Sequence, residues 1–223
     1  DTTEASNPTP WLGKLAPNPC GETMLLDNEP CNLGSINLAK FVTPNGWLMD
    51  ELKDTVELAI EYLDDVLDQN VFPHEDITKA ALLTRKLGLG VMGWADALAT
   101  LGIDYESEYA LETAESIMGF IDNVASGKSY RLREAKGAAP CFDREGPRNA
   151  TLTCIAPTGS ISLIAGCSSG IEPHYAHTWT RTMGDGTIIN ERLPEFPIVP
   201  KTAMEIGWQW HVRHQAAFQK YTD

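Results

Sequence analysis

Two long stretches of helical periodicity constrain the fold of this chain most strongly. From Asp50 to Asn70, apolar residues recur every three or four positions, and acidic side chains occupy the opposite face. A second stretch runs from Ser107 to Lys136, and Gly137 directly after it is a typical helix stop. The β-branched, apolar segment from Thr151 to Ala156 predicts a buried strand. Long helices mixed with strands predict an α/β fold.

Shorter patterns predict the remaining elements. Residues 1–17 contain three prolines and predict irregular backbone, and a turn at 157–159 leads into a further helix. Alternation from Tyr175 to Thr182 predicts a strand. Helices are expected at Glu75–Leu87, Val91–Leu101 and Lys201–Tyr221.

Two local patterns resemble functional sites, but each is better explained by structure. Gly88 to Gly93 has the glycine spacing of a dinucleotide-binding loop, but that loop needs a preceding strand. Because the residues before Gly88 have helical spacing, we expect a helix–turn–helix junction there. The acidic run Glu61, Asp64, Asp65 and Asp68 is expected to form a solvated helix face.

Composition excludes several classes of protein. The 223 residues carry a net charge of −14, which argues against a general nucleic-acid surface. No apolar run is long enough to span a membrane. The five cysteines show neither a CxxC pair nor zinc-finger spacing, so we expect reduced thiols in the cytoplasm and no metal site. Since the chain opens without methionine, we expect an internal piece of a longer protein.

The segment Asn18-Pro19-Cys20-Gly21-Glu22, followed by Cys31, concentrates the chemistry. Pro19 fixes its own φ and disfavours helix at Asn18, while Gly21 lets the chain bend. A fully extended segment would hold Asn18 and Glu22 roughly 13 Å apart, so we expect a curved loop that brings the side chains together. An amide that orients, a thiol that can lose a hydrogen atom and a carboxylate that can take a proton suit chemistry on a polyol.

Four blocks resemble the ribonucleotide reductase family. NPCGETMLLDNEPCNLGSINLAKF (18–41) is similar to that family's active-site finger loop, and NATLTCIAPTGSISLIAGCSSGIEPHYA (149–176) is the second specific match. GLGVMGWADAL (88–98) and WHVRHQAAFQKYTD (210–223) also resemble the family. The sequence of these blocks is most similar to the adenosylcobalamin-dependent class. The resemblance implies that residues 1–223 are one internal fragment of the catalytic domain, part of a ten-stranded α/β barrel with a central finger loop at 18–31.

The resemblance also implies roles for individual residues. Cys20 would be the thiyl radical site, Glu22 would accept the 3′-hydroxyl proton and Asn18 would hold the sugar hydroxyls. Cys31 would be one of two reducing thiols, and its partner would lie upstream of this chain. Cys141, Cys154 and Cys167 match no motif and are expected to be packing residues.

The turn before the predicted helix at 160–165 is expected to bind the substrate diphosphate. Helix N-termini have free N–H groups, and Thr158 and Ser160 add hydroxyls. Gly159 has no side chain to block the approach. Such local donors would let an acidic protein hold an anion. Without the resemblance, residues 157–160 are also a good helix cap of purely structural purpose.

The implied activity is the radical reduction of ribonucleoside di- or triphosphates to 2′-deoxyribonucleotides for DNA replication. It implies adenosylcobalamin as cofactor, or otherwise a radical from a separate metal-containing subunit. An external thiol reductant such as thioredoxin and a homodimer are the expected partners, with no nucleic acid and no membrane. Two alternatives stay open: a glycyl-radical-type barrel enzyme, and a non-catalytic nucleotide-binding fragment. The isolated fragment is expected to be inactive, since it lacks the second redox cysteine.

Overall fold

Parallel strands form the centre of the computed structural model, which describes residues 5–223. β3 (Leu33–Asn37) pairs with β6 (Gly88–Met92) in parallel, with Leu33 opposite Gly88. On the other side of β6, a single parallel bridge joins Leu89 to Thr153. β6 is therefore flanked on both sides, and the predicted strand at 151–156 is present as this short paired segment.

The helix–turn–helix junction predicted for 88–93 is wrong, because residues 88–92 form the strand β6. All five of its residues are buried, so the strand shows no polar alternation that could reveal it in the sequence. A Cβ on Gly90 would come within 2.4 Å of the Cys154 carbonyl oxygen, so glycine allows the close approach of the neighbouring segment. Gly93, with φ +74°, ends the strand, and α4 (Trp94–Leu101) begins after it rather than at Val91.

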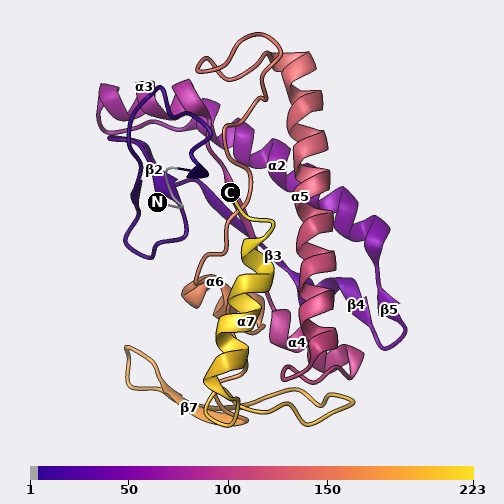
Figure 1. Ribbon diagram of the computed structural model, residues 1–223. Coiled ribbons are helices and arrows are strands. Elements are labelled where there is room, and N and C mark those ends of the chain that lie inside the picture. Colours follow the sequence, from indigo (N-terminus) through magenta and orange to yellow (C-terminus); the bar gives the residue numbers. More distant parts are fainter. Residues whose placement is uncertain (1–4) are drawn as a thin grey trace.

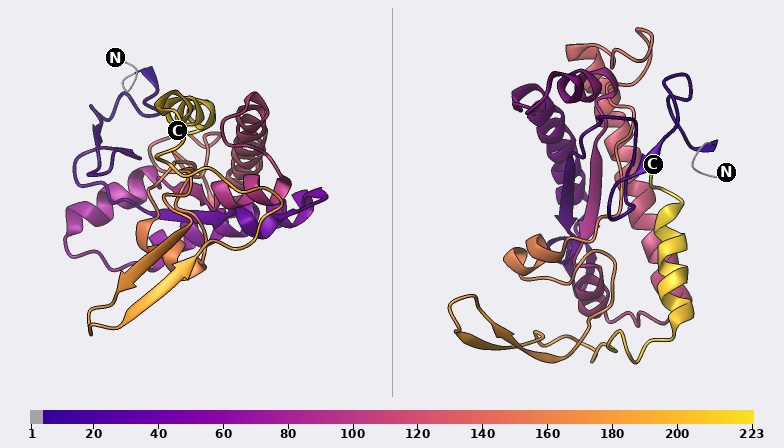
Figure 2. Two further views of the ribbon diagram at one scale, coloured as in Figure 1. Left: turned by 90° about the horizontal axis from the view of Figure 1, so that it is seen from below. Right: turned by 90° about the vertical axis from the view of Figure 1, so that its left-hand side faces the viewer.

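Long helices cover the strands, as Figures 1 and 2 show. α2 (Met49–Gln69) packs on β3 and on α5 (Glu108–Lys136), and α7 (Trp208–Gln219) packs on α5. The helices α2 and α5 match the predicted helices within one residue at each end. The Ser107 hydroxyl caps α5 by accepting from the Ala110 N–H, and Gly137 ends it. The α/β class is therefore confirmed.

The other elements are short and lie mainly at the periphery. The helix expected at 75–87 ends at Thr84 because Arg85 adopts a left-handed conformation, and the helix expected from Lys201 begins only at Trp208. Residues 1–4 of the predicted irregular segment lie outside the described residues, and 6–15 form turns and irregular backbone. The remaining elements are β1 (Ala16–Pro17), β2 (Met24–Leu25), η1 (Leu38–Phe41), β4 (Val42–Thr43), β5 (Gly46–Trp47), α3 (Glu75–Thr84), α6 (Gly159–Ala165), β7 (Thr178–Thr182) and β8 (Ile188–Arg192).

The β7–β8 hairpin projects away from the helices in Figures 1 and 2. Its first strand confirms the prediction from the alternation at 175–182 for residues 178–182, while 175–177 lie outside the strand. Among residues 5–223, no helix has the length and apolar character needed to cross a membrane.

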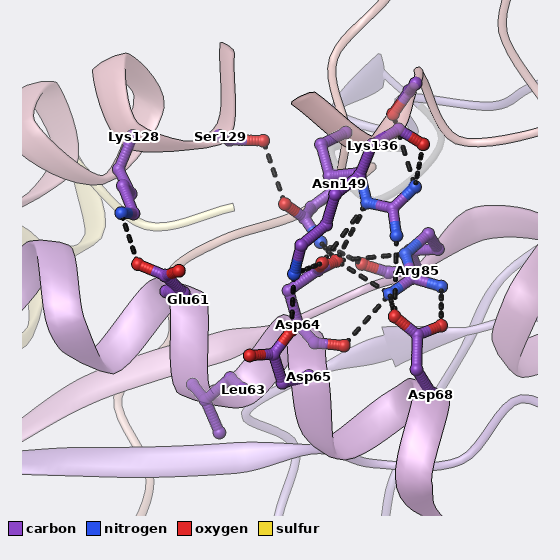
Figure 3. A network of polar contacts seen from close by, with 12 residues as sticks. Glu61, Leu63, Asp64, Asp65, Asp68, Arg85, Lys128, Ser129, Lys136 and Asn149 are labelled. Atoms are coloured by element: carbon purple, nitrogen blue, oxygen red, sulfur yellow. Dashed lines mark hydrogen bonds and ion pairs between the residues drawn. The ribbon is translucent and has the colours of Figure 1, made fainter. Parts of the chain in front are cut away.

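A buried ionic network corrects the prediction of a solvated acidic face on α2 (Figure 3). Asp64 is fully buried and accepts hydrogen bonds from Arg85 Nε at 2.9 Å, Arg148 Nε at 3.2 Å and Asn149 Nδ2 at 3.0 Å. Burial alone would raise the pKa of Asp64, but Arg85 and Arg148 outweigh it and hold that pKa below its usual value. The network joins α2 to the segments that lead into β6 and into the Thr153 bridge.

The other acids of the run lie at the rim of this network. Asp68 pairs with Arg85 at 2.7 Å, Asp65 pairs with Lys136, and Glu61 pairs with Lys128 on α5. The side chains of these three acids remain 40–54% exposed, so they keep contact with solvent, as the sequence predicts. The prediction is therefore wrong at Asp64 alone.

Candidate active site

The predicted catalytic loop is the turn of the β1–β2 hairpin. The Gly21 N–H donates to the Asn18 carbonyl at 3.0 Å, and the Asn18 N–H donates to the Thr23 carbonyl at 3.1 Å. Pro19 occupies the second position of this turn, where its fixed φ is favourable, and Gly21 adopts a φ of +81°. Cys20 lies exposed at the tip. The segment folds back on itself instead of running straight.

A cavity of about 880 Å³ opens beside this hairpin. Cys20, Glu22 and Cys31 all line it, so the structure brings together three of the four residues proposed for catalysis. Its other wall comes from the segment 151–155 and from the end of α7 and the residues after it. The lining residues from that wall are Thr151, Thr153, Ile155, Gln215, Gln219, Lys220, Thr222 and Asp223.

The fourth predicted residue, Asn18, does not line the cavity itself but contacts Cys31, which does. Its side-chain amide donates to Cys31 Sγ at 3.5 Å, and the Thr23 hydroxyl lies 3.3 Å from the same sulfur. The Thr23 N–H in turn donates to Asn18 Oδ1 at 3.3 Å. The hairpin turn therefore holds two polar groups against the Cys31 thiol.

Glu22 has a polar atom in need of a partner. Its Oε2 is buried, and within residues 5–223 it accepts no hydrogen bond. A buried carboxylate oxygen without a donor costs free energy, and such an atom in a cavity wall marks a place where a ligand donor fits. A sugar hydroxyl is a donor of this kind.

The cysteines without a matching motif differ from Cys20 and Cys31 in their environment. Burial, with Cys31, Glu22 and Asp223 as lesser contributions, raises the pKa of Cys154 to about 12. Burial likewise raises the pKa of Cys141 and of Cys167 to about 11. All three thiols therefore stay protonated at neutral pH, while Cys20 and Cys31 are the exposed cysteines.

The predicted phosphate loop lies at the start of α6 and does not line this cavity. Thr158 is buried in a left-handed conformation, and its Oγ1 accepts from the Gly170 N–H at 2.7 Å. Gly159 has open space where a Cβ would stand, and Ser160 is exposed. The Thr158 hydroxyl oxygen therefore supports the loop, and the open surface is at Gly159 and Ser160.

Three residues that the sequence did not single out shape the cavity. Thr23 contacts Cys31, as described above. Lys86 is buried in the wall and donates to the Met24 carbonyl at 2.9 Å. Asp223 accepts from the backbone N–H groups of Leu152 and Thr153, at 2.6 and 3.0 Å. The partners of Lys86 and Asp223 lie 62 to 71 residues away, so no local pattern could have identified these two residues. The alternation of Thr151, Thr153 and Ile155 is the one sequence signal for their common wall.

Comparisons with known proteins agree on one family. The model of the ribonucleotide reductase barrel domain matches residues 12–146 and 142–200. A vitamin B12-dependent ribonucleoside-diphosphate reductase of Mycobacterium tuberculosis is 41% identical over 100% of this chain and 38% of its own length. Its counterpart in Thermoplasma acidophilum is also 41% identical over the whole chain, which covers 34% of that protein. A ribonucleoside-diphosphate reductase subunit alpha of Chlamydia muridarum is 31% identical over 79% of the chain and 21% of its own length. The chain thus spans little more than a third of the first two relatives.

Proposed function

The chain belongs to the ribonucleotide reductase family, in its barrel domain, and from this premise we propose that it carries the radical and reducing cysteines of an adenosylcobalamin-dependent ribonucleoside-diphosphate reductase. One observation carries the proposal: Cys20, Glu22 and Cys31 line a single cavity, and the carboxylate among them has an unpartnered buried oxygen. Residues 1–223 would form one part of a ten-stranded barrel, with 18–31 as the finger loop at its centre.

Cys20 would take the hydrogen atom from C3′ of the ribose and return it later. The S–H and C–H bonds are similar enough in strength for this exchange to run in both directions. A radical at C3′ makes departure of the neighbouring 2′-hydroxyl feasible, which a saturated carbon otherwise resists. The exposed position of Cys20 at the tip of a narrow turn gives its sulfur access to a ring in the cavity.

Glu22 would accept the proton of the 3′-hydroxyl. Its buried oxygen then gains the donor that it lacks in the free protein. Asn18 would hydrogen-bond a second sugar hydroxyl and fix the ring against Cys20.

Cys31 would donate a proton to the departing 2′-hydroxyl, which leaves as water. Two electrons reduce C2′, so two thiols become one disulfide, and the second thiol belongs to the part of the protein outside this chain. Once Cys31 has given up its proton, the Asn18 amide and the Thr23 hydroxyl can both donate to its sulfur. An external dithiol such as thioredoxin would then reduce the disulfide.

Gly159 and Ser160 would bind the substrate diphosphate at the open start of α6, with Thr158 holding the loop. The chain runs from the cavity wall at 151–155 directly into this loop, and we infer that one substrate contacts both. Diphosphates are favoured over triphosphates because the similar proteins are named diphosphate reductases.

The residues of the hairpin fit a radical-generating cofactor. Cys20 is the group that would meet adenosylcobalamin, since its thiol is exposed and the loop around it is tightly turned. When bound, the cofactor supplies an acceptor for the Cys20 hydrogen atom, which leaves a thiyl radical. The chain itself positions this sulfur and keeps it beside the carboxylate.

The test is turnover by the intact protein of which this chain is a part. With adenosylcobalamin and a dithiol reductant, we expect it to convert cytidine diphosphate to the 2′-deoxy product. No turnover with di- or triphosphates would overturn the proposal and favour a non-catalytic or glycyl-radical barrel. Turnover without cobalamin, but with a metal-containing subunit, would overturn only the choice of cofactor.

A further inference from the structure

A buried lysine joins the catalytic hairpin to the central strand. Lys86, two residues before β6, donates to the Met24 carbonyl of β2 at 2.9 Å and to Glu29 Oε2 at 2.9 Å. The side chains of Lys86 and Glu29 are only 4% and 1% exposed. Since an ammonium group is rarely buried unless it is paired, this contact is a built feature of the fold.

Glu29 completes the junction from the other side. Its Oε2 also accepts from the Leu26 N–H at 2.6 Å, and its Oε1 accepts from the Thr84 hydroxyl. The Glu29 N–H donates to the Leu26 carbonyl at 3.1 Å, which closes the turn. The carboxylate therefore binds the 26–29 turn to the chain just before β6.

Along the chain, the segment that this junction holds lies between the two exposed cysteines of the cavity. Cys20 precedes β2, and Cys31 follows the 26–29 turn, so the segment held by Lys86 and Glu29 connects them. The hairpin itself has only short pairing, Ala16 with Leu25 and Pro17 with Met24. A two-stranded hairpin of this length is not stable alone, so its position depends on such anchors.

We propose that Lys86 is a positioning residue, which holds the Cys20 hairpin through Met24 and, together with Glu29, sets it relative to Cys31 and β6. Lys86 acts through the backbone of β2, and the inference rests on the proposed function for its catalytic consequence. An apolar side chain could fill the same volume but could not bind the Met24 carbonyl.

The decisive variant is the double substitution Glu29→Gln/Lys86→Met in the intact enzyme. Lys86→Met alone leaves a buried carboxylate without its cation and could simply fail to fold. The double variant removes both charges together, so stability is largely restored while the bond from position 86 to Met24 stays lost. Glu61→Gln/Lys128→Met is the control, because it makes the same two substitutions in a more exposed pair that joins α2 to α5 away from the cavity.

Hydrogen exchange provides a readout that does not depend on activity. In the double variant we expect the N–H groups of Asn18 and Thr23, which close the hairpin turn, to exchange at least about 10-fold faster. The N–H groups of Leu87 and Leu89, which bond across the central strands, should keep their wild-type rates. The control variant should leave both sets unchanged.

Turnover gives the second readout. We expect kcat to fall at least about 10-fold with KM within about twofold, because a misplaced sulfur weakens the chemical step more than substrate binding. Wild-type exchange at Asn18 and Thr23 in the double variant would overturn the inference, whatever its activity. Faster exchange in a protein whose wild type reduces no ribonucleotide would support the anchor and overturn the proposed function instead.

Discussion

Thr23 Oγ1 lies 3.3 Å from Cys31 Sγ, so the hairpin that carries Cys20 also contacts the second exposed cysteine of the cavity. Asn18 donates to the same sulfur at 3.5 Å. One loop therefore sets the environment of both thiols.

The substitution Thr23→Val tests this contact, because it keeps the shape of the side chain and removes the hydroxyl. Alkylation by iodoacetamide proceeds through the thiolate, so removing a donor to this sulfur should slow alkylation of Cys31 on the order of 5-fold at fixed pH. Peptide mapping by mass spectrometry measures the rates at Cys31 and Cys20 separately. A wild-type rate at Cys31 would contradict the role given to Thr23, and an equal change at Cys20 would point to general loosening of the loop.

The phosphate assignment is tested by Gly159→Ala. Since no atom lies within 4 Å of the position that a Cβ would take, the fold should tolerate alanine, with a change in unfolding free energy within about 0.5 kcal/mol. The methyl group would obstruct the approach of a phosphate, so KM should rise on the order of 10-fold in the intact enzyme. Gly127→Ala in α5 is the control and should leave KM unchanged. An unchanged KM in Gly159→Ala would remove this loop from substrate binding.

Asp64 is predicted to be the most sensitive acid of α2. Asp64→Leu leaves the buried guanidinium groups of Arg85 and Arg148 without their shared carboxylate, and should cost about 3–5 kcal/mol of unfolding free energy. Asp65→Asn removes an exposed partner of Lys136 and should cost less than about 1 kcal/mol. Urea titration of both variants gives the comparison. Equal costs would contradict the buried network.

His214 should make the docking of α7 sensitive to acid. Burial, with smaller contributions from His211 and Arg213, lowers its pKa from 6.5 to about 4, although the bond to the Tyr105 carbonyl opposes this. Its ring is fully buried and accepts from the Trp94 indole N–H at 3.2 Å, so the neutral form is required.

The unfolded chain therefore binds the proton more tightly than the folded chain. This contribution to stability is fully present above pH 6.5 and is lost as the pH falls toward 4, by about 3 kcal/mol in total. Urea titration between pH 7.5 and pH 4 should show this slope in the wild type and a flatter one in His214→Gln. Parallel slopes in the two proteins would contradict the assignment.

Local features of the fold could be predicted from the sequence where the cause is local. The long helices follow from their own periodicity and caps, and the turn at Cys20 follows from Pro19 and Gly21. The strand Gly88–Met92 could not be predicted in this way, because a strand buried on both faces shows no polar alternation. The need for glycine at position 90 arises only from the close approach of Cys154. The strand is defined by neighbours that lie far away in the chain.

The same reason explains the errors and omissions at charged residues. Asp64 has the spacing of a solvated acid, and its burial depends on Arg148, which lies 84 residues away. Lys86 meets Glu29 across 57 residues. The amide, thiol and carboxylate of 18–22 and their curved loop follow from the local sequence, whereas the other wall of the cavity is formed by residues more than 100 positions away.

The most direct test of the account is reduction by the intact enzyme carrying Cys20→Ser, compared with Cys167→Ser as a matched loss of one thiol away from the cavity. The account predicts no detectable 2′-deoxyribonucleotide from Cys20→Ser, since a hydroxyl cannot replace the thiol in hydrogen-atom transfer, and near wild-type turnover from Cys167→Ser. Sustained reduction by Cys20→Ser would contradict the central claim that this sulfur carries the radical.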